Sequence, residues 1–169
     1  MSAPRLFVFS GLPGVGKTTL ARALANEIGA VYLRIDSAED ALRDTGPLQI
    51  DLRDAGYRVL WALAEDNLGI GLDVVGDSVN PVHQTRAGWH NLAHRTGAER
   101  FEIEIICSDE AEHRARVEAR RAALGQTAPD WDMVTARAYT PHTDQRLVVD
   151  TAGRTPGQCL THILDAVLE

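Results

Sequence analysis

Short apolar runs alternate with longer stretches of helical periodicity along this chain. The apolar runs predict five strands, at Leu6–Phe9, Val31–Ile35, Leu72–Val75, Phe101–Ile106 and Leu147–Val149. Their near-continuous apolarity is typical of strands that are buried on both faces of a sheet. The alternation predicts an α/β fold in which helices cover a parallel sheet.

Five longer helices are expected between and after these strands. In the first, Leu20, Leu24 and Ile28 recur at four-residue spacing, and Gly29 follows as a natural stop. The predicted ranges are Lys17–Ile28, Asp51–Leu68, Pro81–Thr96, Asp109–Leu124 and Thr155–Leu168.

One segment, Gly125–Asp144, fits neither pattern. It is polar, contains Pro129 and Pro141 and shows no clear strand, so we expect a flap with one short helix at Asp130–Tyr139. No linker or internal repeat interrupts the chain. Residues 1–169 are therefore expected to form one domain, with a lid or flap at about residues 113–144.

The stretch between the first strand and the first helix reads GLPGVGKTT. It matches the phosphate-binding loop pattern GxxxxGK[ST] in full, in the required position between a strand and a helix. In such a loop, backbone N–H groups turn towards a phosphate, Lys17 offers a charge to the β- and γ-phosphate oxygens, and the Thr18 hydroxyl can hold Mg²⁺. The residues predicted to bind a nucleotide here are Gly11, Leu12, Pro13, Gly14, Val15, Gly16, Lys17, Thr18 and Thr19.

Three predicted strands are followed by an acidic residue, at Asp36, Asp77 and Asp150. Ligands of open parallel sheets bind beyond the carboxyl ends of the strands. Phosphoryl transfer needs one acid near the metal and another that accepts the proton of the attacking hydroxyl, and Asp36 and Asp77 are our candidates. The alternative is that such an aspartate caps the following helix, because Asp36-Ser-Ala-Glu39 also fits a helix start.

Arginines cluster in the helix predicted at Asp109–Leu124. Arg114, Arg116 and Arg121 each have a glutamate at helical spacing, whereas Arg120 has no acid at either spacing. One interpretation is a lid that folds guanidinium groups over the transferring γ-phosphate. The alternative is an ordinary solvated charged face.

The amino-acid composition limits which binding partners and which cellular compartment are expected. Among 169 residues, 17 Lys and Arg stand against 24 Asp and Glu, and the net charge of −7 disfavours nucleic-acid binding through a broad basic face. Cys107 and Cys159 lie far apart and outside any metal-binding pattern, which suits a reducing cytoplasm. No stretch resembles a signal peptide or reaches membrane-spanning length, so we expect a cytoplasmic protein with no membrane partner.

Taken in order, the motifs resemble those of small P-loop kinases grouped with polynucleotide 5′-kinase, chloramphenicol phosphotransferase and zeta toxin. The likeness is carried by GLPGVGKTT, YLRIDSAEDALR, VVGDSVNP, CSDEAEHRARVEARR, PDWDMVTARAY and RLVVDTAG. The resemblance implies a P-loop NTPase fold whose five-stranded parallel sheet has the order 2-3-1-4-5. It also implies ATP with Mg²⁺ as the donor and a hydroxyl as the acceptor.

The same resemblance implies roles for individual residues. Asp36 would be the general base, and Arg116 and Arg120 would be lid arginines, acting together with Lys17, which the loop motif itself predicts to be catalytic. The stretch 77–80 would lie beside the acceptor or the magnesium, so that Asp77 and Thr18 are the candidate metal residues. The loop 150–154 would line the adenine side, with Arg154 contacting the nucleotide.

We therefore expect an ATP-dependent kinase that phosphorylates a hydroxyl of a small molecule. One alternative is a 5′-hydroxyl polynucleotide kinase, which the net charge disfavours. Another is a nucleotide-switch ATPase, but the lid arginines and Asp36 suit transfer to a second substrate better than hydrolysis. The acceptor pocket is expected to form from Ser37–Leu48 and Asn80–Trp89; neither the acceptor nor the oligomeric state follows from the sequence.

Overall fold

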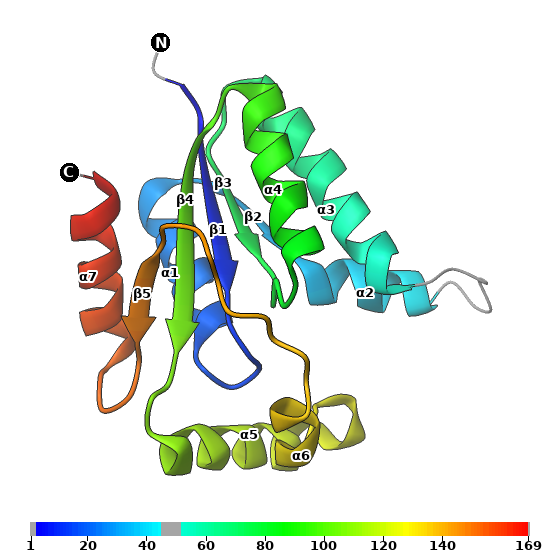
Figure 1. Cartoon of the computed structure of the whole chain (residues 1–169), viewed down its shortest axis with the longest axis vertical. Coiled ribbons are helices and arrows are strands. Elements are labelled where there is room, and N and C mark those ends of the chain that lie inside the picture. Colours follow the sequence, from blue (N-terminus) through cyan, green and yellow to red (C-terminus); the bar gives the residue numbers. More distant parts are fainter. Residues whose placement is uncertain (1–2, 45–51, 169) are drawn as a thin grey trace.

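A five-stranded parallel sheet forms the centre of the computed structural model, which describes residues 3–44 and 52–168 (Figure 1). Its strands are β1 (Arg5–Ser10), β2 (Val31–Arg34), β3 (Val74–Asp77), β4 (Glu99–Ile106) and β5 (Leu147–Asp150). Neighbouring strands are all parallel, in the order β2-β3-β1-β4-β5. The predicted P-loop NTPase fold and its strand order are confirmed.

Helices cover both faces of this sheet. On one face, α1 (Lys17–Ile28) and α7 (Pro156–Leu168) pack against Phe7 and Phe9 of β1. On the other face, α3 (Leu52–Gly69) and α4 (His83–Thr96) pack against Leu6 and Val8. Successive side chains of a strand point to opposite faces, so β1 contributes to both halves of the core and is fully buried along these positions.

Most boundaries differ from the sequence prediction by one or two residues, and two of these differences bear on the site. Ile35, predicted as the end of a strand, is the first residue of α2 (Ile35–Asp44), and its side chain is buried beside α3 and α4. β3 extends to Asp77 because it stays in register with β1, where Phe9 pairs with Asp77. Asp51, the predicted start of α3, lies outside the described residues.

The remaining helices lie below the carboxyl ends of the strands in Figure 1. They are α5 (Glu110–Leu124), a 3₁₀ turn at Gly125–Thr127 and α6 (Trp131–Thr135). α6 is shorter than the predicted helix at 130–139, and the chain continues through residues 136–146 as an irregular segment, here called the strap, that passes over β4 to reach β5. Within residues 3–44 and 52–168, no helix has the length and apolarity needed to cross a membrane.

Candidate active site

The phosphate-binding loop has a backbone shape that only glycine adopts easily. Gly11, Gly14 and Gly16 have φ angles of 144°, 88° and 94°. A Cβ atom on Gly11 would lie 2.4 Å from the carbonyl oxygen of Ile105, and one on Gly14 would lie 2.6 Å from Cγ2 of Val117. Three glycines of the predicted motif are therefore required by conformation, and two of them also by close packing.

His113 of α5 contacts the backbone of this loop. Its Nε2 lies 2.8 Å from the carbonyl oxygen of Pro13, and Trp131 of α6 packs edge-on against its ring at 5.0 Å between centroids. His113 is buried, so the contact is shielded from water. Sequence reasoning did not assign His113, and its neighbours in the arginine cluster gave no signal for this role.

Lys17 and Asp77 form a buried ion pair at the loop. The carboxylate of Asp77, at the end of β3, accepts hydrogen bonds from the Lys17 ammonium and, at 2.7 Å, from the Tyr32 hydroxyl. Burial by itself would raise the pKa of Asp77, but the charge of Lys17 and hydrogen bonds from Lys17, Tyr32 and Thr18 lower it below its ordinary value. Asp77 is therefore an ionised carboxylate next to the Thr18 hydroxyl.

Burial and the nearby Asp77 raise the pKa of Tyr32, so this phenol remains a hydrogen-bond donor. Hard oxygen ligands such as a carboxylate and a hydroxyl suit Mg²⁺, which proteins usually bind through few side chains together with substrate phosphates. Residues 3–44 and 52–168 contain no group of three or more His, Cys, Asp or Glu placed to hold a metal. The residues present thus fit a magnesium ion that arrives with a nucleotide.

Asp36 lies in the first turn of α2. Its side chain is 44% exposed and forms an ion pair with Arg34 of β2 at 2.5 Å. Both residues border a cavity of about 790 Å³ that is lined by the phosphate-binding loop, α2, α5 and residues between 124 and 137. Ten residues predicted for the site line this cavity: Leu12, Pro13, Gly14, Gly16, Lys17, Thr18, Thr19, Asp36, Arg116 and Arg120.

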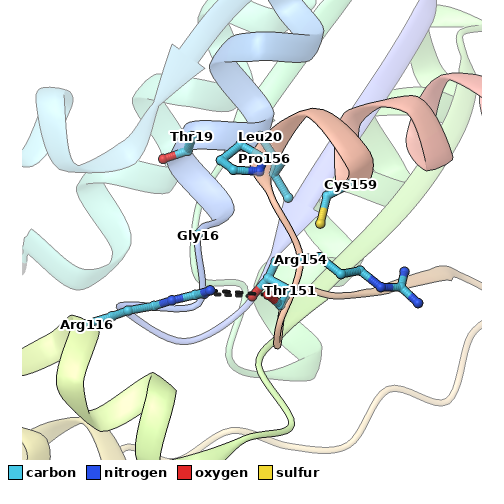
Figure 2. Close-up of a pocket in the computed structure, with 8 residues that line it drawn as sticks. All are labelled: Gly16, Thr19, Leu20, Arg116, Thr151, Arg154, Pro156 and Cys159. Carbon is cyan, nitrogen blue, oxygen red and sulfur yellow. Dashed lines mark hydrogen bonds between the residues drawn. The ribbon is translucent and has the colours of Figure 1, made fainter.

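A second pocket of about 270 Å³ adjoins the loop on the side of α7 (Figure 2). Arg116 donates to the Oγ1 of Thr151 at 2.8 Å and to its carbonyl oxygen at 3.2 Å, and it also pairs with Glu112. Arg116 lines both spaces, whereas the predicted Arg154 lines only this one. The full lining is Gly16, Thr19, Leu20, Arg116, Thr151, Arg154, Pro156 and Cys159.

Asn80 supports the site from within. It has a φ of 48°, its amide donates to the Phe9 carbonyl oxygen at 3.0 Å, and its Oδ1 accepts from the Trp89 indole at 3.0 Å. The stretch 77–80 was expected beside the acceptor or the magnesium. Val79 does line the large cavity, but the Asn80 side chain is fully buried and fixes the end of β1 instead.

Arg86 of α4 connects this region to the strap. Its buried guanidinium donates to the carbonyl oxygens of Asn80 at 2.9 Å and Thr140 at 2.6 Å, and it lies over the Tyr139 ring at 5.3 Å. These contacts tie the strap to the loop that follows β3. Sequence reasoning missed this buried arginine, because one cation on a helix gives no signal of burial.

A second buried polar cluster lies under the strap. Glu104 of β4 accepts from Arg146 and, at 3.0 Å, from the Tyr139 hydroxyl. His142 Nε2 lies 3.3 Å from the Tyr139 hydroxyl oxygen and 3.3 Å from Oγ of Ser10, the residue before the phosphate-binding loop. The alternating polar positions in FEIEII were the available sequence signal for this cluster.

Comparison with known proteins places this architecture in context. The profile of the AAA domain family matches residues 6–141. Protein Rv2004c of Mycobacterium tuberculosis, described as uncharacterized, is 31% identical over 152 residues, which cover 76% of this chain and 30% of the relative. The chain thus spans about 30% of the length of that curated relative.

Two solved structures share the whole fold. A candidate kinase from Chloroflexus aurantiacus superposes with a TM-score of 0.77 at 23% identity, covering 99% of this chain and 98% of that one. The APS kinase CysC of Mycobacterium tuberculosis, in complex with AMPPNP and APS, gives a TM-score of 0.76 at 17% identity and covers 100% of both chains. The fold is that of P-loop kinases, and the chain belongs to the AAA domain family.

Proposed function

We propose that this chain is an ATP-dependent kinase that transfers the γ-phosphoryl group to a hydroxyl of a small molecule. One observation carries the proposal: a single cavity of about 790 Å³ is lined by the phosphate-binding loop, the carboxylate of Asp36 and the guanidinium groups of Arg116 and Arg120. Phosphoryl transfer depends on positioning and charge stabilisation, and these are the groups it requires.

The nucleotide would occupy both spaces around the loop. Its phosphates would bind at Gly11–Thr19, and its nucleoside would enter the smaller pocket, where Leu20, Pro156 and Cys159 offer apolar contacts beside Arg154. Arg116 lines both spaces and would contact the nucleotide between them. The fold likeness to a kinase crystallised with AMPPNP supports ATP as the donor.

Thr18 and Asp77 would hold Mg²⁺, which when bound neutralises and orients the β- and γ-phosphates. On the protein side, Lys17 would turn from Asp77 towards the phosphate oxygens. Asp36 would accept the proton of the attacking hydroxyl, with Arg34 fixing the direction of its carboxylate. Arg120 would stabilise the charge that develops on the γ-phosphoryl group.

The finer assignments belong to this proposal as well. A kinship with the polynucleotide 5′-kinase, chloramphenicol phosphotransferase and zeta toxin group, and a cytoplasmic location, are consistent with it. A nucleic-acid acceptor is disfavoured by the net charge of −7. Asp36 in the same cavity as Arg116 and Arg120 suits transfer to a second substrate better than hydrolysis by a nucleotide switch.

The proposal is tested by ADP release from ATP and Mg²⁺ with and without a panel of hydroxyl compounds. We expect ADP formation that depends on an acceptor, together with a phosphorylated product identified by mass spectrometry. Slow ADP formation that no acceptor stimulates would instead favour the switch ATPase.

Lys17 is the only lysine in the chain, which allows a direct test of the nucleotide site. Acylation with an amine-specific reagent can then modify only Lys17 and the N-terminal amine. AMPPNP with Mg²⁺ should protect Lys17 while the N-terminus still reacts, as read by peptide mass spectrometry. Equal modification of Lys17 with and without AMPPNP would argue against phosphate binding at this loop.

A further inference from the structure

The large cavity contains more positive than negative side chains, although the whole chain is acidic. Among its described lining residues, the acids are Asp36, Glu39 and Asp40, and the cations are Lys17, Arg34, Arg43, Arg116, Arg120 and Arg137. Lys17 lies in the loop, and Arg116 and Arg120 lie on α5, so the phosphates of a bound nucleotide would contact these three cations. The other three arginines face the region left for the acceptor.

On this acceptor side, the arginines differ in how well they are neutralised. Arg43 is paired with both Glu39 at 3.1 Å and Asp40 at 2.6 Å. Arg34 is paired with Asp36 through one guanidinium nitrogen, but its Nε is buried and has no hydrogen-bond partner within the described residues. A buried donor without a partner is uncommon in folded proteins and marks a place where a ligand or water can bind.

Arg137 is the least compensated of the three. Within residues 3–44 and 52–168, its guanidinium has no ion-pair or hydrogen-bond partner. Glu39 of α2 lines the same cavity as Arg137. Burial raises the pKa of Glu39 and of Tyr57 in α3, and the positive charge of Arg137 opposes both shifts.

The backbone around Arg137 is held in place on both sides. The N–H of Arg137 donates to the carbonyl oxygen of Val134 at 3.3 Å, and that of Thr140 donates to Pro81 at 2.8 Å. Arg86 additionally binds the carbonyl oxygen of Thr140. The backbone at Arg137 is therefore held in place, and its exposed side chain lies at the edge of the cavity.

We propose that the acceptor carries an anionic group, a carboxylate, phosphate or sulfate, in addition to its hydroxyl, and that Arg137 binds this group. This inference rests on the proposed kinase function, because it assumes that the cavity beyond the loop receives the acceptor. An arginine guanidinium matches the oxygens of such groups through paired hydrogen bonds. Arg34, with its unused Nε, supplies a second donor on the same side.

Calorimetry with protein saturated with AMPPNP and Mg²⁺ tests this proposal. The probes are matched pairs: gluconate against glucitol, glycerate against glycerol, and glucose 6-phosphate against glucose. At least one acidic compound should bind, and its neutral counterpart should bind at least tenfold more weakly. Arg137→Gln should weaken the acidic ligand about tenfold or more and leave AMPPNP affinity unchanged.

Arg114→Gln is the matched control, since Arg114 lies on α5, pairs with the exposed Glu118 and does not line the cavity. It should bind the acidic ligand as the wild type does. Equal binding of a neutral partner, no binding of any acidic probe, or an unchanged affinity in Arg137→Gln would overturn the proposal. Failure to bind AMPPNP, measured first, would refute the kinase function itself, so the two failures are distinguishable.

Discussion

At the scale of single residues, loss of the ion pair between Lys17 and Asp77 should weaken both nucleotide binding and the stability of the fold. Lys17→Ala removes a charged donor from the phosphates, and such hydrogen bonds contribute about 1.5–3 kcal/mol, so ATP affinity should fall about tenfold to a hundredfold. It also leaves the fully buried Asp77 without its cation, which should lower the unfolding temperature. Titration calorimetry with AMPPNP and thermal unfolding measure the two effects, and unchanged affinity would contradict the assigned role of Lys17.

Asp36 is the residue on which transfer to an acceptor should depend most. Asp36→Asn keeps the shape of the side chain but removes the basic oxygen, so turnover should fall about a hundredfold or more while AMPPNP affinity persists. Stability should change little, because the pair with Arg34 is partly exposed. Asp44→Asn, at the exposed end of the same helix and outside the cavity lining, is the control and should stay active. Near-normal product formation by Asp36→Asn would return Asp36 to a structural role at the start of α2.

At the scale of elements, α5 separates its arginines by what each one contacts. Arg116 is bound to Thr151 and Glu112, and Arg121 donates to the Ala128 carbonyl oxygen at 2.6 Å, which fixes the chain after α5. Arg120 lines the cavity and has no ion-pair or hydrogen-bond partner within the described part of the chain. The pairs expected from helical spacing are present for Arg114 with Glu118 and for Arg116 with Glu112. Arg121 instead lies 3.9 Å from Asp130, whereas Arg120, which has no acid at helical spacing, has no ion pair within the described residues.

Arg120→Ala should therefore lower kcat by a hundredfold or more, as for an arginine that stabilises the transition state, with little change in AMPPNP affinity. Steady-state kinetics with an identified acceptor measure kcat, and calorimetry measures the affinity for AMPPNP. Arg114→Ala, on the outward face of α5, is the control. Full kcat in Arg120→Ala together with a large loss in Arg121→Ala would show that the other face of α5 carries the function.

Arg86 is expected to stabilise the strap through its buried hydrogen bonds. Arg86→Leu leaves the carbonyl oxygens of Asn80 and Thr140 without their buried donor. A loss of about 3 kcal/mol is expected, which for a domain of this size lowers the unfolding temperature by about 6–12 °C. Limited proteolysis should also cut the strap faster. Arg95→Leu is the control, because the ion pair of Arg95 with Glu65 is exposed, and it should change neither the unfolding temperature nor the cleavage rate much. If Arg86→Leu behaved like Arg95→Leu, the role of Arg86 in holding the strap would be contradicted.

At the scale of the whole molecule, the sequence predicts best where local and tertiary signals agree. α1 was predicted at its observed bounds because the loop motif starts it and Gly29, with a φ of 69°, ends it. The start of α2 was misassigned because apolar Ile35 continues a strand pattern, although its side chain belongs to the core beside α3 and α4. β3 was shifted because Gly76 and Asp77 have low strand propensity, and only pairing with β1 and β2 keeps them extended.

The site shows the same division. Motif spacing identified the seven loop residues that line the large cavity, because the phosphate-binding chemistry fixes their types and positions. Asp36, Arg116 and Arg120, which line it too, were predicted from a strand end, an arginine cluster and the family resemblance. The supports at His113, Asn80 and Arg86 could not be predicted, since each depends on contacts between segments far apart in the chain. Burial of a polar side chain is a property of the assembled fold, and no local pattern reports it.

The cluster under the strap should make the stability of the whole domain depend on pH. His142 is 2% exposed, and burial lowers its pKa below the ordinary value of 6.5, assisted by Arg86 and Arg146 and opposed by Glu104 and Asp144. As the pH falls below about 6.5, the unfolded chain takes up a proton at His142 before the folded chain does, so the free energy of unfolding decreases. The lowered pKa of Glu104, where hydrogen bonds from Arg146 and Tyr139 outweigh burial, acts in the same direction but at more acidic pH.

The unfolding temperature should therefore be nearly flat above about pH 7 and fall as the pH is lowered towards about 5. His142→Gln removes the titrating ring, so its unfolding temperature, even if lower at neutral pH, should depend less on pH across this interval. His94→Gln, on an exposed position of α4, should keep the slope of the wild type. Parallel curves for the wild type and His142→Gln, measured by differential scanning calorimetry, would show that the buried imidazole does not couple proton uptake to unfolding.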